Sequence, residues 1–160
     1  MQNLDQASLP ADIRVPAGNV VVLQAQGRGD LLYECQAVRR TPFEYTWLLR
    51  NPSLQLQDGR GNVVTYYPGT RSRWVHSDGS EVIAREFVEV SLSSGNMPLL
   101  RAKADPTEGR GALENVSYIQ NLRNQGGVVT GKSCTAAALG MRMSVPYEAD
   151  YVFWRPADRG

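Results

Sequence analysis

Apolar and polar residues alternate over short stretches along most of the chain, which is the period of β-strands with one buried face. The clearest region, residues 51–90, predicts two consecutive β-hairpins that turn at residues 58–62 and 77–80. Both turns contain Asp-Gly, and glycine readily adopts the positive φ that tight hairpin turns require. The strands expected to pair are 54–56 with 63–66, and 73–75 with 81–83.

The remaining segments follow the same pattern, with turn residues between them. Gly27-Arg28-Gly29-Asp30 is interpreted as a turn, and the Ala-rich segment 135–139 as at most one helical turn. Further strands are expected at residues 19–25, 31–37, 43–49, 86–92, 97–104, 116–122, 141–145 and 147–155. No amphipathic segment of helical length is present. The pattern predicts an all-β fold, either a single antiparallel β-sandwich or a β-barrel, of about eight to ten strands.

Length and charge limit the domain organisation and the partners. Residues 1–18 are polar and hold Pro10 and Pro16, so we expect an extended N-terminal arm and then a single β-rich domain over residues 19–160. The formal net charge is +1, which gives no electrostatic reason to expect nucleic acid or an anionic membrane as a partner. No apolar run is long enough for a membrane span. A small-molecule partner is compatible with the composition, and the oligomeric state stays open.

The sequence predicts no cofactor. His76 is the only histidine, which excludes a multi-histidine metal site, so we expect no metal. No Gly-x-Gly-x-x-Gly lies between a strand and a helix, and no βαβ pattern is present to hold a dinucleotide.

The second hairpin gathers the side chains best suited to a small ligand. Trp74 and His76 share one face of the expected strand, whereas Arg73 lies on the other face and Arg71 joins it on a regular strand. We expect Trp74 to supply apolar contact, His76 a titrating group, and Arg71 or Arg73 a clamp for an anion. Trp47 is a further candidate, because aromatic side chains that do not fill the core can line a barrel cavity. In the alternative interpretation His76 and both arginines are exposed strand and turn residues, and the tryptophans are core.

The two cysteines, Cys35 and Cys134, are 99 positions apart and cannot belong to a short CxxC motif. Either they form one long-range disulfide or they are two buried free thiols.

Several pieces of the sequence are familiar when they are taken together and in order. They are Leu32-Tyr33-Glu34-Cys35, Trp47, Leu54-Gln55-Leu56-Gln57-Asp58, Gly69-Thr70, Trp74, Ser77-Asp78-Gly79-Ser80-Glu81-Val82, Tyr118-Ile119-Gln120, Gly126-Gly127, Cys134 and Val145-Pro146-Tyr147-Glu148-Ala149-Asp150-Tyr151. This set resembles a family of secreted bacterial and fungal proteins catalogued only as a domain of unknown function, over the chain from about Pro10 onward.

The resemblance implies a secreted or periplasmic protein, and with it the Cys35–Cys134 disulfide, since oxidising compartments favour disulfides. It implies no activity. Some fungal members carry a malate dehydrogenase label, which the missing dinucleotide motif does not support here. The family tends to approach the second hairpin with a Gly-Pro-Thr-Trp type of sequence, so Arg71 and Arg73 are features of this chain.

Three functions follow as hypotheses. The first is an exported β-domain that binds a small, partly apolar ligand. The second is a small cavity enzyme of the isomerase, cyclase or hydrolase type, with His76 or a carboxylate as the catalytic acid or base. The third is a structural envelope or cell-surface protein. An open aromatic groove favours the first, a closed cavity that contains His76 and an ionisable partner favours the second, and a filled core favours the third.

Overall fold

A computed structural model of the protein describes residues 6–69, 71–105 and 109–157. Residues 1–5 of the predicted arm, Thr70 between the predicted hairpins, residues 106–108 and residues 158–160 lie outside the described residues. The elements are three 3-10 helices, η1 (Gln6–Ser8), η2 (Ala11–Ile13) and η3 (Ala136–Ala138), and the strands β1 (Asn19–Ala37), β2 (Tyr45–Leu49), β3 (Leu54–Asp58), β4 (Val63–Tyr67), β5 (Ser72–His76), β6 (Glu81–Val90), β7 (Leu99–Asp105), β8 (Tyr118–Gly126) and β9 (Arg142–Pro156).

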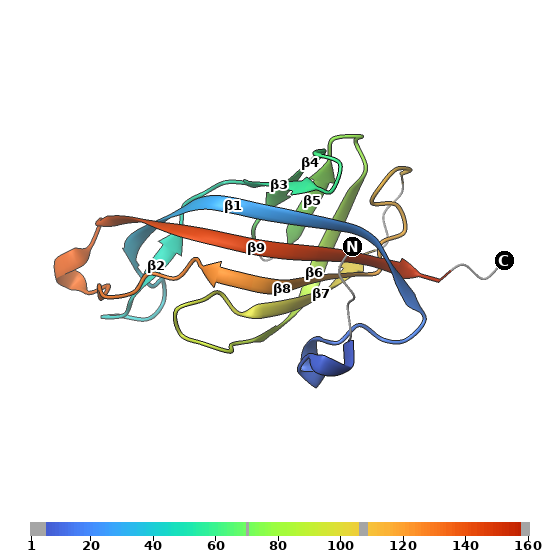
Figure 1. Ribbon diagram of the computed structural model, residues 1–160. Helices are drawn as coiled ribbons and strands as arrows, with labels where there is room; N and C mark the ends of the chain where they lie inside the picture. The colour runs from blue at the N-terminus through green and yellow to red at the C-terminus, as the bar shows by residue number, and fades with distance from the viewer. Residues whose placement is uncertain (1–5, 70, 106–108, 158–160) are drawn as a thin grey trace.

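Eight of these strands form a closed antiparallel barrel (Figure 1). Hydrogen-bonded neighbours follow the order β1-β3-β4-β5-β6-β7-β8-β9, and β9 pairs with β1 to close the cylinder. The extra strand β2 pairs with the last five residues of β1, Tyr33–Ala37, beyond the place where β3 pairs with β1. The predicted all-β class is confirmed, and of the two predicted architectures the barrel is present. The contact between β1 and β3 is the shortest in the wall, since β3 pairs only with Ala25–Gly27 of β1.

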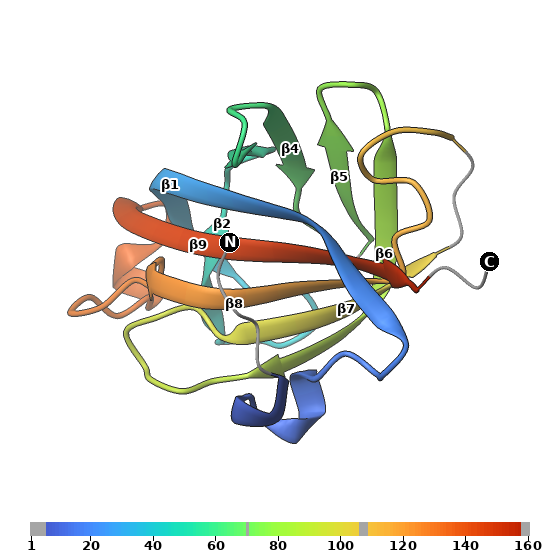
Figure 2. The same ribbon diagram turned by 45° about the vertical axis from the view of Figure 1, so that its right-hand side comes forward.

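Both predicted hairpins are confirmed. Leu56 pairs with Val64 in the first, and Trp74 pairs with Val82 in the second. The Asp58 carboxylate fixes the first turn by accepting hydrogen bonds from the backbone amides of Arg60 and Asn62, each at 2.9 Å. Consecutive pairing places β4, β5 and β6 side by side in the wall (Figure 2).

The prediction that β1 and β9 are each broken into two strands is wrong. They form one long, continuously paired ribbon in which Gly29 pairs with Tyr147 and Asp30 with Pro146. The residues that signalled a break in each strand therefore face one another across the ladder. Gly29 has a φ of 150°, which glycine adopts readily, and the pairing continues through it.

Inward side chains from every barrel strand fill one end and the middle of the interior. They include Ala25, Leu56, Val64, Trp74, Val82, Ala102, Ile119 and Phe153. Trp74 meets Phe153 edge to face, with ring centroids 6.2 Å apart, and the small alanines make room for these large rings. At the end of the barrel that carries the turns 58–62 and 77–80, Leu113 and Val116 also enter the core. We call this the closed end, and the opposite end the open end.

The segment predicted as an extended arm holds η1 and η2 in its described part, and Ile13 and Val15 are buried. Val15 packs against Val152 and Trp154 on the outer face of the barrel. Gln120, also outward and fully buried, donates to the Ile13 carbonyl at 2.7 Å and accepts from the Trp154 indole at 2.9 Å. These contacts explain why polar Gln120 is tolerated inside a covered interface.

Among the described residues, no helix has the length and hydropathy required to cross a bilayer.

Candidate functional site

The open end of the barrel contains a cavity of about 400 Å³. Leucines and valines form much of its surface: Leu31, Leu49, Leu54, Leu100, Val128 and Val129. Aromatic side chains complete it, with Tyr33, Tyr66, Tyr147 and Tyr151 from the barrel strands and Trp47 from β2. A hollow of this size with a mostly apolar lining has the properties of small-molecule sites.

Stacked aromatic rings form the inner end of the cavity. Tyr66 lies parallel to Trp74, with centroids 4.8 Å apart and planes 10° apart, and Tyr151 meets the Trp74 ring at 61°. Trp74 is completely buried, and it packs against two of the tyrosines that line the cavity. Its place is therefore behind the cavity surface, where it fixes the orientation of those two rings.

The polar groups of the cavity are few and mostly neutral. Burial raises the pKa of Tyr33, Tyr66, Tyr147 and, most strongly, Tyr151, so these hydroxyls stay protonated at neutral pH. Glu89 is the acidic side chain on the lining, and it is exposed. Within the described chain, no lysine, arginine or histidine lines this cavity. An anionic ligand would therefore find no opposite charge there.

Asn121 places an unpartnered acceptor at the cavity. Its side chain is 5% exposed and hydrogen-bonds Tyr151, but its Oδ1 atom has no hydrogen-bond partner among the described residues. A buried acceptor without a partner costs about 1–3 kcal/mol. The atom is itself covered, so a ligand N–H or O–H group would reach it and remove that cost once the Asn121 side chain rotates toward the cavity.

One wall of the cavity is the segment 127–134, which is held by three links to β1 and β2. The Tyr33 hydroxyl donates to the Gly127 carbonyl at 2.5 Å, and the Trp47 indole donates to the Lys132 carbonyl at 3.1 Å. The third link is the disulfide between Cys35 and Cys134, which the structure contains as the resemblance implied. Together these links hold Val128 and Val129 against the cavity.

His76 lies at the closed end, between two carboxylates. The Asp78 amide donates to Nδ1 at 3.0 Å, which places the ring proton on Nε2, where it is donated to Asp58 Oδ2 at 3.2 Å. His76 is only 6% exposed. The imidazole thus connects the turn of the first hairpin to the turn of the second, and the residues that line the open-end cavity do not include it.

Asp78 extends this network to the loop that follows β7. Its carboxylate accepts from the Ser80 hydroxyl at 2.6 Å and from the Ala112 amide at 2.8 Å, and these bonds, with the Ser80 amide, hold the pKa of Asp78 far below its usual range. Burial opposes ionisation of Asp58, but the amides of Asn62 and Arg60 outweigh it and lower the pKa of that carboxyl as well. Gly111 is needed here, because a Cβ on it would lie 2.7 Å from Asp78 Oδ2.

The structure therefore separates the residues predicted to share a site. Trp74 is in the core, His76 is in the closed-end network, and Trp47 lines the open-end cavity. Arg73 lies 4.6 Å above the Tyr67 ring and 3.8 Å from the Glu81 carboxylate, and Arg71 is exposed.

Sequence reasoning did not single out the tyrosines that line the cavity. The available signal was the alternation of Tyr147, Ala149, Tyr151 and Phe153, which puts all four side chains on one face of β9. It did not say which of them lies near an opening.

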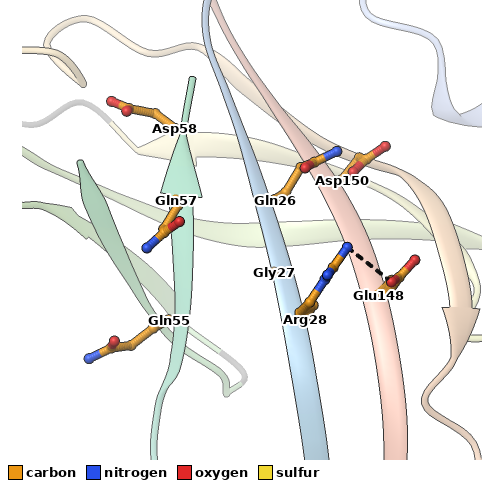
Figure 3. A pocket seen from close by; sticks show the side chains of 8 residues that line it. All are labelled: Gln26, Gly27, Arg28, Gln55, Gln57, Asp58, Glu148 and Asp150. Atoms are coloured by element: carbon orange, nitrogen blue, oxygen red, sulfur yellow. Dashed lines mark ion pairs between the residues drawn. The ribbon is translucent and has the colours of Figure 1, made fainter. Parts of the chain in front are cut away.

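A second hollow of about 510 Å³ lies on the outer face, where β3 separates from β1. Figure 3 shows Arg28 on β1 directed toward Glu148 on β9, while Gln55 and Gln57 project from β3 on the other side. Arg28 pairs with Glu148 at 3.3 Å, and the two remaining carboxylates, Asp150 and Asp58, are engaged by Arg123 and by the first turn. Because its charged groups are already paired, this groove is a weaker candidate than the cavity.

The comparison with protein families gives one match. Residues 16–155 match the family described as "Protein of unknown function (DUF3455)". The chain belongs to the DUF3455 family. The match includes residues of every strand of the DUF3455 barrel and confirms the resemblance to a domain of unknown function. No curated protein and no solved structure matches the chain.

Proposed function

We propose that this protein is an exported binding protein that holds a small, largely apolar, uncharged ligand in the open-end cavity. The observation that carries the proposal is the cavity itself: about 400 Å³, apolar and aromatic, within a closed barrel. An open aromatic hollow is the interior expected of a binding domain, as opposed to a filled structural barrel. The disulfide supports export to an oxidising compartment.

The polar groups narrow the ligand further. Neutral tyrosine hydroxyls and the unpartnered Asn121 oxygen suit a ligand that carries at least one hydrogen-bond donor on an apolar body. A negatively charged ligand is disfavoured, because burying an unpaired charge among apolar groups is costly.

Binding can be tested with N-phenyl-1-naphthylamine, a neutral fluorescent probe with two aromatic groups and one N–H donor. We expect saturable fluorescence enhancement with one site per chain. Val129→Trp places a bulky ring in the cavity, and overpacking of about 1–3 kcal/mol predicts roughly 5- to 150-fold weaker binding. The matched control is Thr130→Trp, at the exposed neighbouring position of the same segment. Equal binding by the two variants, or no binding by the wild type, would contradict the proposal.

The role of Asn121 is tested by a second probe, 1-phenylnaphthalene, which lacks the N–H group. The wild type should bind the donor-bearing probe about fivefold more tightly, as expected for one hydrogen bond of about 1 kcal/mol. Asn121→Leu should abolish this preference. A preference that persists in Asn121→Leu would show that another group accepts from the ligand.

A further inference from the structure

The surface around the open end is unusually apolar for an exposed region. Five of the seven large apolar side chains exposed on the described residues belong to it: Phe43, Leu48, Leu92, Leu139 and Met141. Phe43 is 93% exposed at the tip of the β1–β2 connection, and Leu92 is 70% exposed in the β6–β7 connection. Figure 1 shows η3, next to Leu139, and the β1–β2 connection together at one extremity of the molecule.

Pairing across β2, β1 and β9 brings two of these positions to the same end of the β1–β9 ribbon. Leu48 on β2 pairs with Glu34 on β1, which pairs with Arg142 on β9. The Cys35 amide donates to the Met141 carbonyl at 2.9 Å, so the chain around Met141 lies directly against β1 at the next residue. Leu48 and the chain around Met141 therefore flank β1 on its two sides, near its C-terminal end.

The backbone at the tip holds Phe43 outward in a strained conformation. Phe43 has a φ of 67° and Arg40 a φ of 70°, the left-handed region that bulky residues rarely occupy. Burial of the Phe43 ring does not compensate for this strain, since the ring is almost fully exposed. Strain that the fold itself does not use points to a function of the exposed side chain.

The same surface carries basic side chains without ion-pair partners among the described residues, although the chain as a whole is nearly neutral. Arg39, Arg40, Arg50 and Lys132 are exposed, and none forms an ion pair with another described residue. Acidic residues at this end include Glu44 and Glu89, which are exposed, and Glu34, which is neutralised by Arg142 at 2.8 Å. The net charge of +1 therefore conceals a cluster of unpaired cations beside the exposed apolar side chains.

We propose that the open end docks onto an anionic lipid surface, with Phe43 inserted among the acyl chains and Arg39, Arg40 and Lys132 at the headgroups. Apolar side chains flanked by basic ones are the chemistry of interfacial membrane binding. The cavity opens at the same end, so docking would face it toward the lipid. The proposal does not rest on the proposed ligand, because docking requires only the outer side chains.

The test is co-sedimentation of the whole protein with phosphatidylcholine vesicles, with and without phosphatidylglycerol, at low and high salt. We expect binding to the anionic vesicles that weakens as salt rises. Phe43→Asn removes the ring and suits the positive φ, so it should lower the partition coefficient about tenfold while leaving thermal stability equal or higher. The control is Val20→Asn, at a 42% exposed position near the N-terminal end of β1, away from the open end. It should bind like the wild type.

The charge contribution is tested by Arg39→Gln against Arg155→Gln, since Arg155 is exposed near the opposite end of the ribbon. The first should weaken binding about fivefold and the second should have little effect. Absence of vesicle binding, or binding that ignores both Phe43→Asn and Arg39→Gln, overturns the proposal. A concentration-dependent dimer that Phe43→Asn abolishes, without vesicle binding, also overturns it and assigns the surface to self-association. Binding of the naphthylamine probe without vesicles is measured separately, so the two proposals can fail independently.

Discussion

Replacing His76 by alanine tests whether this residue stabilises the fold or belongs to a ligand site. In the structure the imidazole donates to Asp58 and accepts from the Asp78 amide, and it is almost completely buried. A hydrogen bond to a charged acceptor contributes about 1.5–3 kcal/mol and a neutral one about 0.5–1.5 kcal/mol. The expected loss is therefore about 2–4 kcal/mol, a large part of the roughly 5–15 kcal/mol typical of a domain.

The assay is urea unfolding at neutral pH, followed by tryptophan fluorescence, because Trp74 is buried in the folded core. His76→Gln serves as the conservative variant: its amide can still donate toward Asp58, so we expect it to retain part of the lost stability. Binding of the naphthylamine probe to folded His76→Ala should match the wild type, because His76 lies outside the cavity lining. A variant of wild-type stability that has lost binding would refute this reasoning and would restore His76 to the ligand site.

Three further results are expected. Asp78→Asn should lower the free energy of unfolding at neutral pH and make it depend less on acid. Because folding lowers the pKa of Asp78, the ionised carboxylate stabilises the wild type above the pKa of an unfolded aspartate, and this stabilisation is lost as the pH falls below about 4. Urea unfolding of both proteins between pH 7 and 3 measures the difference. The Cys35→Ser/Cys134→Ser double variant should have a free energy of unfolding about 4–5 kcal/mol lower than the wild type, from the chain entropy that the disulfide removes. Thiol titration of the unfolded, unreduced wild type should find no free thiol, and a detectable thiol would contradict the disulfide. Gly27→Ala should lower the free energy of unfolding by about 1–3 kcal/mol, because its Cβ would lie 2.6 Å from a buried leucine of β3. Gly59→Ala, whose Cβ would lie in open space, should change it little. Equal stabilities of the two variants would refute the steric argument.

The parts of the fold that local sequence determines were predictable. The hairpin at 77–80 follows from its Asp-Gly turn, in which Gly79 has a φ of 93°, whereas in the turn at 58–62 the positive φ lies at Gly61 (81°) and not at Gly59. The registers of both hairpins need no distant partner. Barrel closure depends instead on the pairing of β1 with β9, which no local signal encodes. For the same reason, the local sequence wrongly indicates strand ends at Gly29 and Pro146. In the structure the pairing of β1 with β9 keeps both residues within their strands.

The candidate site shows the same division. The sequence shows which aromatic and ionisable side chains are available for a site, but not which of them the fold brings together. Trp74 and His76 do share the inward face predicted by alternation, yet one is enclosed by the core and the other by the closed-end turns. Trp47 reaches the cavity only because β2 continues the sheet past the barrel, and Tyr151 and Asn121 meet there from adjacent strands.

The pairing of the first and last strands also determines when the molecule can fold. Asn19 pairs with Pro156 and Glu34 with Arg142, so the ladder that closes the barrel joins positions between 137 and 108 residues apart. Contacts of such sequence separation slow folding, and all-β proteins dominated by them fold on a scale of about milliseconds to seconds. During synthesis the hairpins of β3 to β6 can form early, but the cylinder cannot close before β9 is available. Until then the chain is an open sheet with unpaired edges, a form that is prone to aggregation.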